Sequence, residues 1–191
     1  YVFNGKEMEY QIRLPQQSAL KDNPNQIAHT LYMLLSEAVQ NCLSTQEIGS
    51  LLSGGLDSSA ISAIARHHIK TLHTFAAGVN SAPDLFYARE VAEYIGSIHH
   101  EVVVTQQDLI AILPEVIYHL ESFDPLLVRS SVTHYLVSRL AADYVSAVFS
   151  GEGGDELFAG YEYLKSIPLE KLPDELRDIM LRLHNTALQR V

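Results

Sequence analysis

Two short segments, residues 53–59 and 150–156, concentrate the residue types that bind phosphate groups and metal ions. The first reads Ser-Gly-Gly-Leu-Asp-Ser-Ser and the second Ser-Gly-Glu-Gly-Gly-Asp-Glu. Adjacent glycines allow a tight turn in which backbone N–H groups come close to a ligand. A helix that starts behind such a turn adds unpaired N–H donors and the positive end of its dipole. Asp57 and Asp155 add carboxylates, which are oxygen ligands suited to Mg²⁺.

The charges of these segments indicate how a polyphosphate would be bound. Neither segment contains Lys or Arg, and the first lacks the Lys-Ser/Thr ending of a Walker loop. Phosphate charge must therefore be neutralised by backbone amides, by Mg²⁺ and by cations from elsewhere. Segment 150–156 alone would be explained more simply as a glycine-rich surface loop with solvated acids. Its pairing with segment 53–59 favours one shared site.

The sequence around both segments alternates between expected strands and helices. Strands are expected at 48–52, 72–77, 100–104 and 145–149, and helices at 24–42, 60–65, 84–95, 109–120 and 130–144. This alternation predicts an α/β fold, a doubly wound parallel sheet with helices on both faces. Ligands of such sheets lie beyond the carboxyl ends of the strands, where the strand order reverses. If the strands ending at Leu52 and Phe149 are neighbours, both segments face one crevice, and Asp57 and Asp155 can share one Mg²⁺.

Individual residues predict where the helices begin, end and pack. Asn23 and Gln26 have the spacing of a capping box at the start of the first helix. Asp84 is expected to cap the helix that ends before Gly96. Cys42 is expected to be a core residue of the first helix rather than a nucleophile. The residues expected on the buried face of that helix are Ile27, Leu31, Leu34, Leu35, Ala38, Val39 and Cys42.

Length, composition and net charge limit the possible domain organisation and the possible kinds of partner. Residues 1–20 are expected to form a hairpin, with its turn at Asn4-Gly5, and a linker ahead of one domain at 21–191. Thirteen Lys and Arg against 23 Asp and Glu give a net charge of -10 without a basic block, which argues against a nucleic-acid partner. The single cysteine excludes an internal disulfide and fits a reducing compartment. No apolar run reaches the roughly 18 residues of a membrane span, so we expect no membrane partner and a cytoplasmic protein.

The first segment resembles the pyrophosphate loop of the N-type ATP pyrophosphatases, which include the asparagine, GMP, NAD and argininosuccinate synthetases. The sequence GEGGDELFAGY, at 151–161, closely resembles the corresponding segment of asparagine synthetases. Further agreements lie at 74–78, 83–85, 99–101 and 118–121, so the resemblance runs from about residue 26 to residue 165. It implies the adenine nucleotide alpha hydrolase-like fold of this group.

The resemblance also implies a reaction and the residues that perform it. Such enzymes use ATP to adenylate the side-chain carboxylate of aspartate, release pyrophosphate, and let ammonia convert β-aspartyl-AMP into asparagine and AMP. The implied roles are Mg²⁺ binding at Asp57 and Asp155, a proton acceptor at Glu152, and a residue near the intermediate at Arg129, just before a helix expected from Ser130. The residues implied for nucleotide binding are Leu52, Ser53, Gly54, Gly55, Asp57, Ser58, Ser59, Ala77, Gly78, Ser150 and Gly151.

Departures from the family pattern keep alternatives open. The family often has threonines before the arginine, whereas Leu126, Leu127 and Val128 precede Arg129 here. A relative that activates another carboxylate, such as a β-lactam synthetase, is therefore one alternative, and a non-catalytic nucleotide-binding module is another. The family's glutaminase domain, which supplies ammonia, and its downstream phosphate-contacting lysine are not part of the sequence. We expect a piece of a longer protein, compatible with a homodimer, that on its own binds ATP or AMP weakly and makes no asparagine.

Overall fold

The computed structural model describes residues 2–3, 6–7, 23–43 and 47–184, and the chain divides into two compact units, Tyr1–Leu34 and Leu35–Val191. In the first unit, β1 (Val2–Phe3) pairs antiparallel with β2 (Lys6–Glu7), with Phe3 opposite Lys6. The two strands of the expected hairpin are therefore present. The Asn4-Gly5 turn and the domain boundary expected at residue 20 lie outside the described residues.

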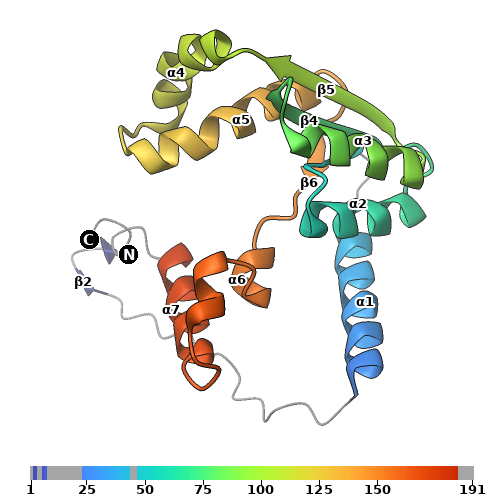
Figure 1. Cartoon of the computed structure of the whole chain (residues 1–191), viewed down its shortest axis with the longest axis vertical. Helices are drawn as coiled ribbons and strands as arrows, with labels where there is room; N and C mark the ends of the chain where they lie inside the picture. Colours follow the sequence, from blue (N-terminus) through green and yellow to red (C-terminus); the bar gives the residue numbers. More distant parts are fainter. Residues whose placement is uncertain (1, 4–5, 8–22, 44–46, 185–191) are drawn as a thin grey trace. The chain divides into compact units, whose positions relative to one another are not determined.

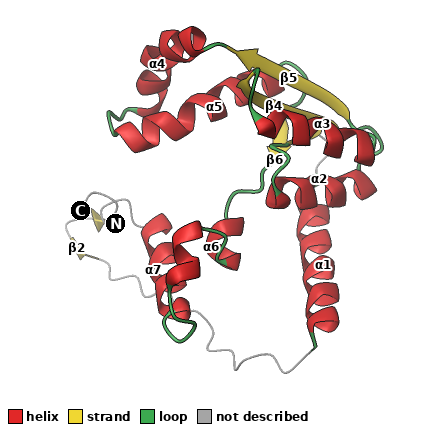
Figure 2. Cartoon of the chain, viewed as in Figure 1, coloured by secondary structure: helices red, strands yellow, loops and turns green. Residues whose placement is uncertain are grey.

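The second unit is built on a four-stranded parallel sheet (Figures 1 and 2). Its strands are β3 (Ile48–Leu51), β4 (His73–Val79), β5 (Ile98–Val104) and β6 (Ala147–Phe149), arranged in the order β5-β4-β3-β6. The chain moves from β3 outward to β4 and β5, and then returns to the other side of β3 with β6. The strand order therefore reverses between β3 and β6, which is where such a sheet binds its ligands.

Helices cover both faces of this sheet, because alternate residues of β4 point to opposite sides. On one face, Leu72 and Ala76 pack with residues of α2 (Leu56–His68) and α3 (Pro83–Ile95). On the other face, Phe75 packs with α5 (Pro125–Ala142), which also contacts α4 (Gln106–Leu120). After β6 follow α6 (Gly154–Phe158), a 3-10 helix at Glu162–Ser166, and α7 (Leu172–His184). The predicted doubly wound α/β fold is confirmed. Among the described residues, no helix has the length and apolar character required to cross a membrane.

Several helices do not start where they were expected. The helix α2 begins at Leu56 rather than at residue 60, and α4 begins at Gln106 rather than at residue 109. The helix expected from Ser130 begins at Pro125, because Asp124 Oδ1 accepts hydrogen bonds from the N–H groups of Leu126 (2.9 Å) and Leu127 (3.0 Å). Proline is well suited to the first helical position, since it has no N–H to leave unpaired. Asp84 is not a cap but lies in the first turn of α3, whose N-cap residue is Ala82. The predicted end of α3 is confirmed, because Gly96 adopts a left-handed conformation (φ 65°).

The first helix, α1 (Pro24–Asn41), begins as predicted but is not buried as predicted. Asn23 and Gln26 exchange backbone-to-side-chain hydrogen bonds of 3.1 and 3.0 Å, which form the expected capping box. In the second unit, Leu35 and Val39 of this helix pack with Ile64. Of the seven residues expected to be buried, Val39 is buried, Leu31 and Leu35 are half-buried, and Ile27, Leu34, Ala38 and Cys42 are exposed. The helical spacing of apolar residues identifies an apolar face of the helix, but it does not show which part of the protein packs on that face.

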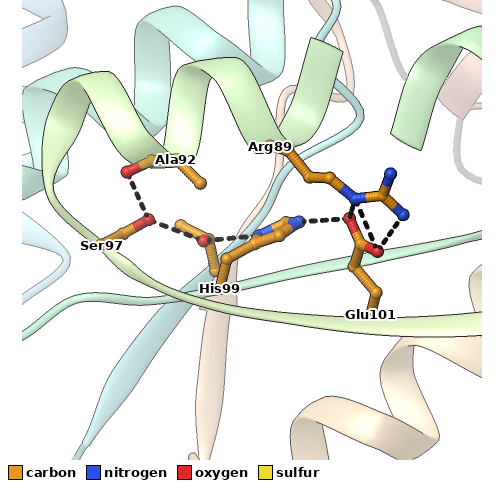
Figure 3. Close-up of polar contacts among 6 residues, drawn as sticks. Arg89, Ala92, Ser97, His99 and Glu101 are labelled. Carbon is orange, nitrogen blue, oxygen red and sulfur yellow. Dashed lines mark hydrogen bonds and ion pairs between the residues drawn. The ribbon is translucent and has the colours of Figure 1, made fainter. Parts of the chain in front are cut away.

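A chain of polar side chains fastens α3 to the sheet (Figure 3). Arg89 on α3 donates hydrogen bonds of 2.8 and 2.6 Å to the two carboxylate oxygens of Glu101 on β5. Nε2 of His99 lies 3.1 Å from Glu101, and Nδ1 lies 2.9 Å from the hydroxyl of Thr74, which in turn lies 2.8 Å from Ser97 Oγ. Because a carboxylate only accepts hydrogen bonds, Nε2 of a neutral His99 carries the proton and Nδ1 accepts from Thr74.

The surroundings oppose a second proton on His99. Burial of the imidazole lowers its pKa, and the charge of Arg89 acts in the same direction, although the neighbouring Glu101 acts against both. Burial raises the pKa of Glu101, but the hydrogen bond and charge of Arg89, together with His99, outweigh burial and leave that pKa below its ordinary value. Glu101 therefore stays ionised and keeps Arg89 in place.

We expect His99 to make the stability of the fold sensitive to mild acid. Below about pH 6.5 the unfolded state takes up a proton at His99 that the folded state does not, so the free energy of unfolding decreases as the pH falls. Urea unfolding at about pH 7 and about pH 5.5 measures this loss, and His99→Asn should reduce it. His67→Asn, at an exposed position of α2, should retain the full loss. Equal pH dependence in all three proteins would contradict the assignment.

Candidate functional site

The pairing of β3 with β6 brings the two chemistry-bearing segments to one place at the edge of the sheet. Ser50 on β3 pairs with Phe149 on β6, so segments 53–59 and 150–156 start side by side. A cavity of about 220 Å³ lies where they meet. Its lining residues come from both segments and from their surroundings: Leu51, Ser53, Gly55, Leu56, Asp57, Ser58, His134, Ser150, Gly151, Glu152, Gly153, Gly154, Asp155, Glu156 and Tyr161. The two segments face one crevice, as expected.

The first turn, at 53–55, is held by its own hydroxyl groups and by a close contact with α3. Ser58 Oγ lies 2.9 Å from Ser53 Oγ, accepts from the Ser53 N–H at 3.2 Å and donates to the Gly55 carbonyl at 3.2 Å. Gly54 has a φ of +79°, and a Cβ there would lie 2.5 Å from Cβ of Tyr87. Glycine is therefore required at position 54 both by conformation and by space.

The start of α2 offers donors to an anion. Gly55 is its N-cap residue and makes no side-chain capping bond. Among the described residues, the first-turn N–H groups of Leu56 and Asp57 also have no backbone partner. These N–H groups lie at the positive end of the α2 dipole. Both the free donors and the dipole favour the binding of phosphate groups. Asp57 in the first turn is itself favoured by this dipole.

The second turn, at 150–154, packs directly on the start of α2. A Cβ at Gly151 would lie 2.7 Å from the backbone N of Ser58 and 3.0 Å from the carbonyl carbon of Asp57. Any side chain at position 151 would therefore push against backbone, which cannot rotate out of the way. Gly153 has a φ of +96° and provides the left-handed residue that turns the chain into α6. The absence of a side chain at 151 allows the second turn to touch the start of α2, directly after the first turn.

The cavity is strongly acidic. Four carboxylates line it, those of Asp57, Glu152, Asp155 and Glu156, and no Lys or Arg belongs to the lining among the described residues. Glu156 is only 9% exposed and accepts a hydrogen bond from the hydroxyl of Tyr161. Donation to this carboxylate raises the pKa of Tyr161, so the phenol stays protonated. A polyphosphate could enter this cavity only together with cations.

This acidic cavity fits Mg²⁺ bound to phosphate better than a metal ion held by protein alone. Among the described residues, no group of three or more His, Cys, Asp or Glu side chains could hold a metal ion by itself. Mg²⁺ usually takes one or two protein carboxylates and completes its shell with phosphate oxygens and water. Asp57 and Asp155, both in the lining, could supply that pair.

A second cavity, of about 260 Å³, adjoins the first. The two share four lining residues, among them Ser53, His134 and Glu152. The second cavity also has apolar walls, which include Leu52 and Ala77, two residues predicted at the AMP moiety. An apolar cavity beside a phosphate-binding turn suits the ring system of a nucleotide.

Three residues predicted to bind nucleotide do not line either cavity. Gly54 is packed against α3, and Gly78 is buried on β4, where a Cβ would lie 3.3 Å from Cγ of Leu85. Ser59 Oγ is buried and has no hydrogen-bond partner among the described residues. Gly54 and Gly78 therefore serve the packing around the site, whereas Ser59 carries an unpaired hydroxyl next to the first turn.

Arg129 lies apart from the two cavities. Because α5 begins at Pro125, Arg129 is a helical residue, and the expectation that it precedes the helix is wrong. It is exposed and lines a groove of about 330 Å³ between α4 and α5, whose walls include Leu109 and Val132. This groove shares Thr133 with the second cavity. Arg129 therefore lies next to the second cavity rather than in it, and Thr133 is the residue that lines both the groove and that cavity.

Three residues with polar side chains that line the first cavity had no predicted role. Glu156 and Tyr161 belong to the segment that carries the family resemblance, and the run of acids after Gly154 could have drawn attention to Glu156. His134 lies in the middle of α5, and no local pattern distinguishes it from the other histidines of the chain. Its place at both cavities follows only from how α5 packs on the sheet.

The sequence is similar to one known family and to individual proteins that carry a similar name. Residues 30–190 match the family described as "Asparagine synthase". The chain is 42% identical over 165 residues to the glutamine-hydrolysing asparagine synthetase of Bos taurus, covering 82% of this chain and 29% of that protein. It is 40% identical over 150 residues to that of Zea mays, covering 73% of this chain and 26% of that protein. The chain thus spans less than a third of the length of these relatives.

A solved structure of NMN synthetase from Francisella tularensis has a similar fold. Its TM-score to this chain is 0.50 at 20% sequence identity, over 74% of this chain and 59% of that chain. At this identity the similarity supports the α/β fold alone.

We expect Gly151→Ala to destabilise the protein by about 1–3 kcal/mol, because an added methyl group would press on the backbone of Ser58. Chemical unfolding measures the change. Gly55→Ala is the matched control, since a Cβ at position 55 would meet only Ser53 Oγ, at 3.4 Å. Equal stability of the Gly151→Ala protein and the unsubstituted protein would show that the two turns are not packed as described.

Proposed function

This chain belongs to the asparagine synthase family, and we propose that it forms the ATP-binding part of an enzyme that makes asparagine from aspartate. ATP would adenylate the side-chain carboxylate of aspartate and release pyrophosphate, and ammonia would then displace AMP to give asparagine. Activation is needed because a carboxylate oxygen is a poor leaving group until it is joined to phosphate. The observation that carries the proposal is the meeting of the two glycine turns around one acidic cavity.

In this proposal the nucleotide occupies both cavities. The N–H groups at the start of α2 and the hydroxyls of Ser53 and Ser58 bind the pyrophosphate portion of ATP. The apolar walls at Leu52 and Ala77 receive the adenosine portion. Ser150 and Gly151 would contact AMP, Gly55 would offer its backbone to the phosphates, and the unpaired hydroxyl of Ser59 supports a donor role at the same end of α2.

Mg²⁺ is the proposed partner of the carboxylates of Asp57 and Asp155. When bound there it would neutralise part of the charge of the phosphate groups in a cavity without Lys or Arg. Without such a cation, ATP would face four carboxylates at close range, and like charges in a partly buried site repel strongly.

The carboxylate of Glu152 is the proposed proton acceptor during attack by ammonia. Its side chain lines both cavities, so it lies between the proposed metal side and the proposed adenosine side. Arg129 is the proposed contact for a carboxylate, because its guanidinium makes no hydrogen bond or ion pair with any described residue. Ammonia would come from glutamine hydrolysis elsewhere in a longer cytoplasmic protein.

A second candidate is a family member that activates a larger carboxylic acid. The groove beside Arg129 has mainly apolar walls, including Leu109, Ile110 and Val128. Such walls suit a carboxylate that carries an apolar body better than they suit aspartate.

Substrate-dependent exchange of labelled pyrophosphate into ATP tests the proposal and separates the two candidates. In the full-length protein we expect exchange to require aspartate and Mg²⁺, because only a reversible adenylation returns pyrophosphate to ATP. Glutamate and a panel of apolar carboxylic acids serve as comparisons. Exchange with an apolar acid but not with aspartate would favour the second candidate, and no exchange with any acid would contradict adenylation.

We expect Asp57→Asn and Asp155→Asn each to weaken Mg²⁺-dependent ATP binding by at least about tenfold. An amide is a weaker Mg²⁺ ligand than a carboxylate, and the loss of even an outer-shell partner of a metal costs about 10- to 100-fold. Calorimetry with and without Mg²⁺ measures the difference. Asp143→Asn, at the end of α5 and outside both linings, is the control. Unchanged Mg²⁺-ATP affinity in both site variants would exclude a shared metal.

A further inference from the structure

Two glycines of the second segment border the two carboxylates proposed to bind metal. A Cβ at Gly154 would lie 2.5 Å from Cγ of Asp57 and 2.6 Å from its Oδ2. A Cβ at Gly160 would overlap Oδ1 of Asp155 and lie 3.0 Å from its Cγ. Real Cβ atoms do not approach other atoms this closely. Each carboxylate therefore fills the space that a side chain at the glycine position would need.

Backbone conformation does not explain these two glycines. Among the described glycines, those with positive φ are Gly54, Gly96 and Gly153, so Gly154 and Gly160 have backbone angles that other residues also adopt. An alanine at either position would meet a steric obstacle and no conformational one.

The backbone at both glycines is held in place, so the carboxylates are the atoms that would have to move. Gly154 donates its N–H to the Gly151 carbonyl at 3.3 Å, and Gly160 donates to the Asp155 carbonyl at 3.0 Å. Asp57 lies in the first turn of α2, so its own backbone is fixed by the helix. Moving Cγ of Asp57 requires another staggered χ1 rotamer, and Oδ1 of Asp155 can also turn about the broad χ2 torsion, so in both cases the carboxylate oxygens change direction.

We propose that Gly154 and Gly160 are positioning residues, which fix the directions of the Asp57 and Asp155 carboxylates for a divalent cation. The inference rests on the metal site of the proposed function. Mg²⁺ demands near-ideal octahedral geometry at about 2.0–2.1 Å, so a carboxylate turned to another rotamer is lost as a ligand. Gly154 belongs to the second turn but positions a carboxylate at the start of α2, so the cation site is complete only when the second turn is packed on that helix.

Binding of the cation together with ATP is the first test, with Mn²⁺ as a paramagnetic probe that occupies oxygen-rich sites. Gly154→Ala and Gly160→Ala should each weaken Mn²⁺ binding by at least about tenfold, measured by electron paramagnetic resonance. Gly96→Ala is the matched control. It strains a left-handed residue (φ 65°) with open space around it and should lower the unfolding temperature without changing Mn²⁺ affinity.

A double-mutant cycle on stability is the second test and needs no metal. Asp57→Ala removes the carboxylate that obstructs position 154, so Gly154→Ala should lower the urea midpoint less in that background than in the unsubstituted protein. The same holds for Gly160→Ala with Asp155→Ala. If a glycine variant fails to fold, the second substitution should restore folding. Equal losses in both backgrounds, or no restoration, would overturn the proposal.

The two tests separate this proposal from the function on which it rests. No binding of Mn²⁺ by the unsubstituted protein in the presence of ATP would overturn the proposed cation site, and the positioning role with it. Full Mn²⁺ affinity in both glycine variants, with the unsubstituted protein binding normally, would overturn the positioning role alone.

Discussion

The backbone of Gly151 and the N–H group of Ser58 lie so close that no side chain fits between the two turns, and the geometry of the site depends on this contact. It exists because β6 returns to pair with β3 after the chain has passed through β4 and β5. A contact between two backbones cannot be relieved by a change of rotamer. The position of segment 150–156 relative to the start of α2 is therefore fixed by the sheet.

Electrostatics then limits what the cavity can hold. The start of α2 attracts anions, and the carboxylate of Asp57 already occupies part of that favourable field. Phosphate groups brought to the same place would repel four carboxylates in a chain whose net charge is -10. A divalent cation between phosphate and carboxylate removes the conflict, because each anion then faces a positive charge. The acids and the amides are complementary only when a metal–phosphate complex binds between them.

Local signals in the sequence predicted the parts of the structure that depend on local chemistry. The capping box at Asn23, the end of α3 at Gly96 and the adjacency of the two glycine segments are all confirmed. The predicted start of α5 at Ser130 is wrong because Asp124 and Pro125 form a strong helix start further upstream. Burial along α1 was wrong for a different reason, since a helix can be amphipathic without a described partner for its apolar face. Long-range packing, which brings His134 to both cavities, leaves no local pattern to detect.

The helix α5 links the carboxylate side of the proposed reaction to the nucleotide side. Arg129 and Thr133, one turn apart, line the apolar groove, and Thr133 and His134 line the second cavity. Val137 and Ala141, further along the same helix, pack against Phe75 in the core. Residues on one helix keep their spacing, because rotation about single bonds moves side chains but not the helical backbone. In the proposed reaction, the distance between an acid bound beside Arg129 and a nucleotide bound beside Leu52 would therefore be set by the packing of α5 on β4, and not by the loops around the site.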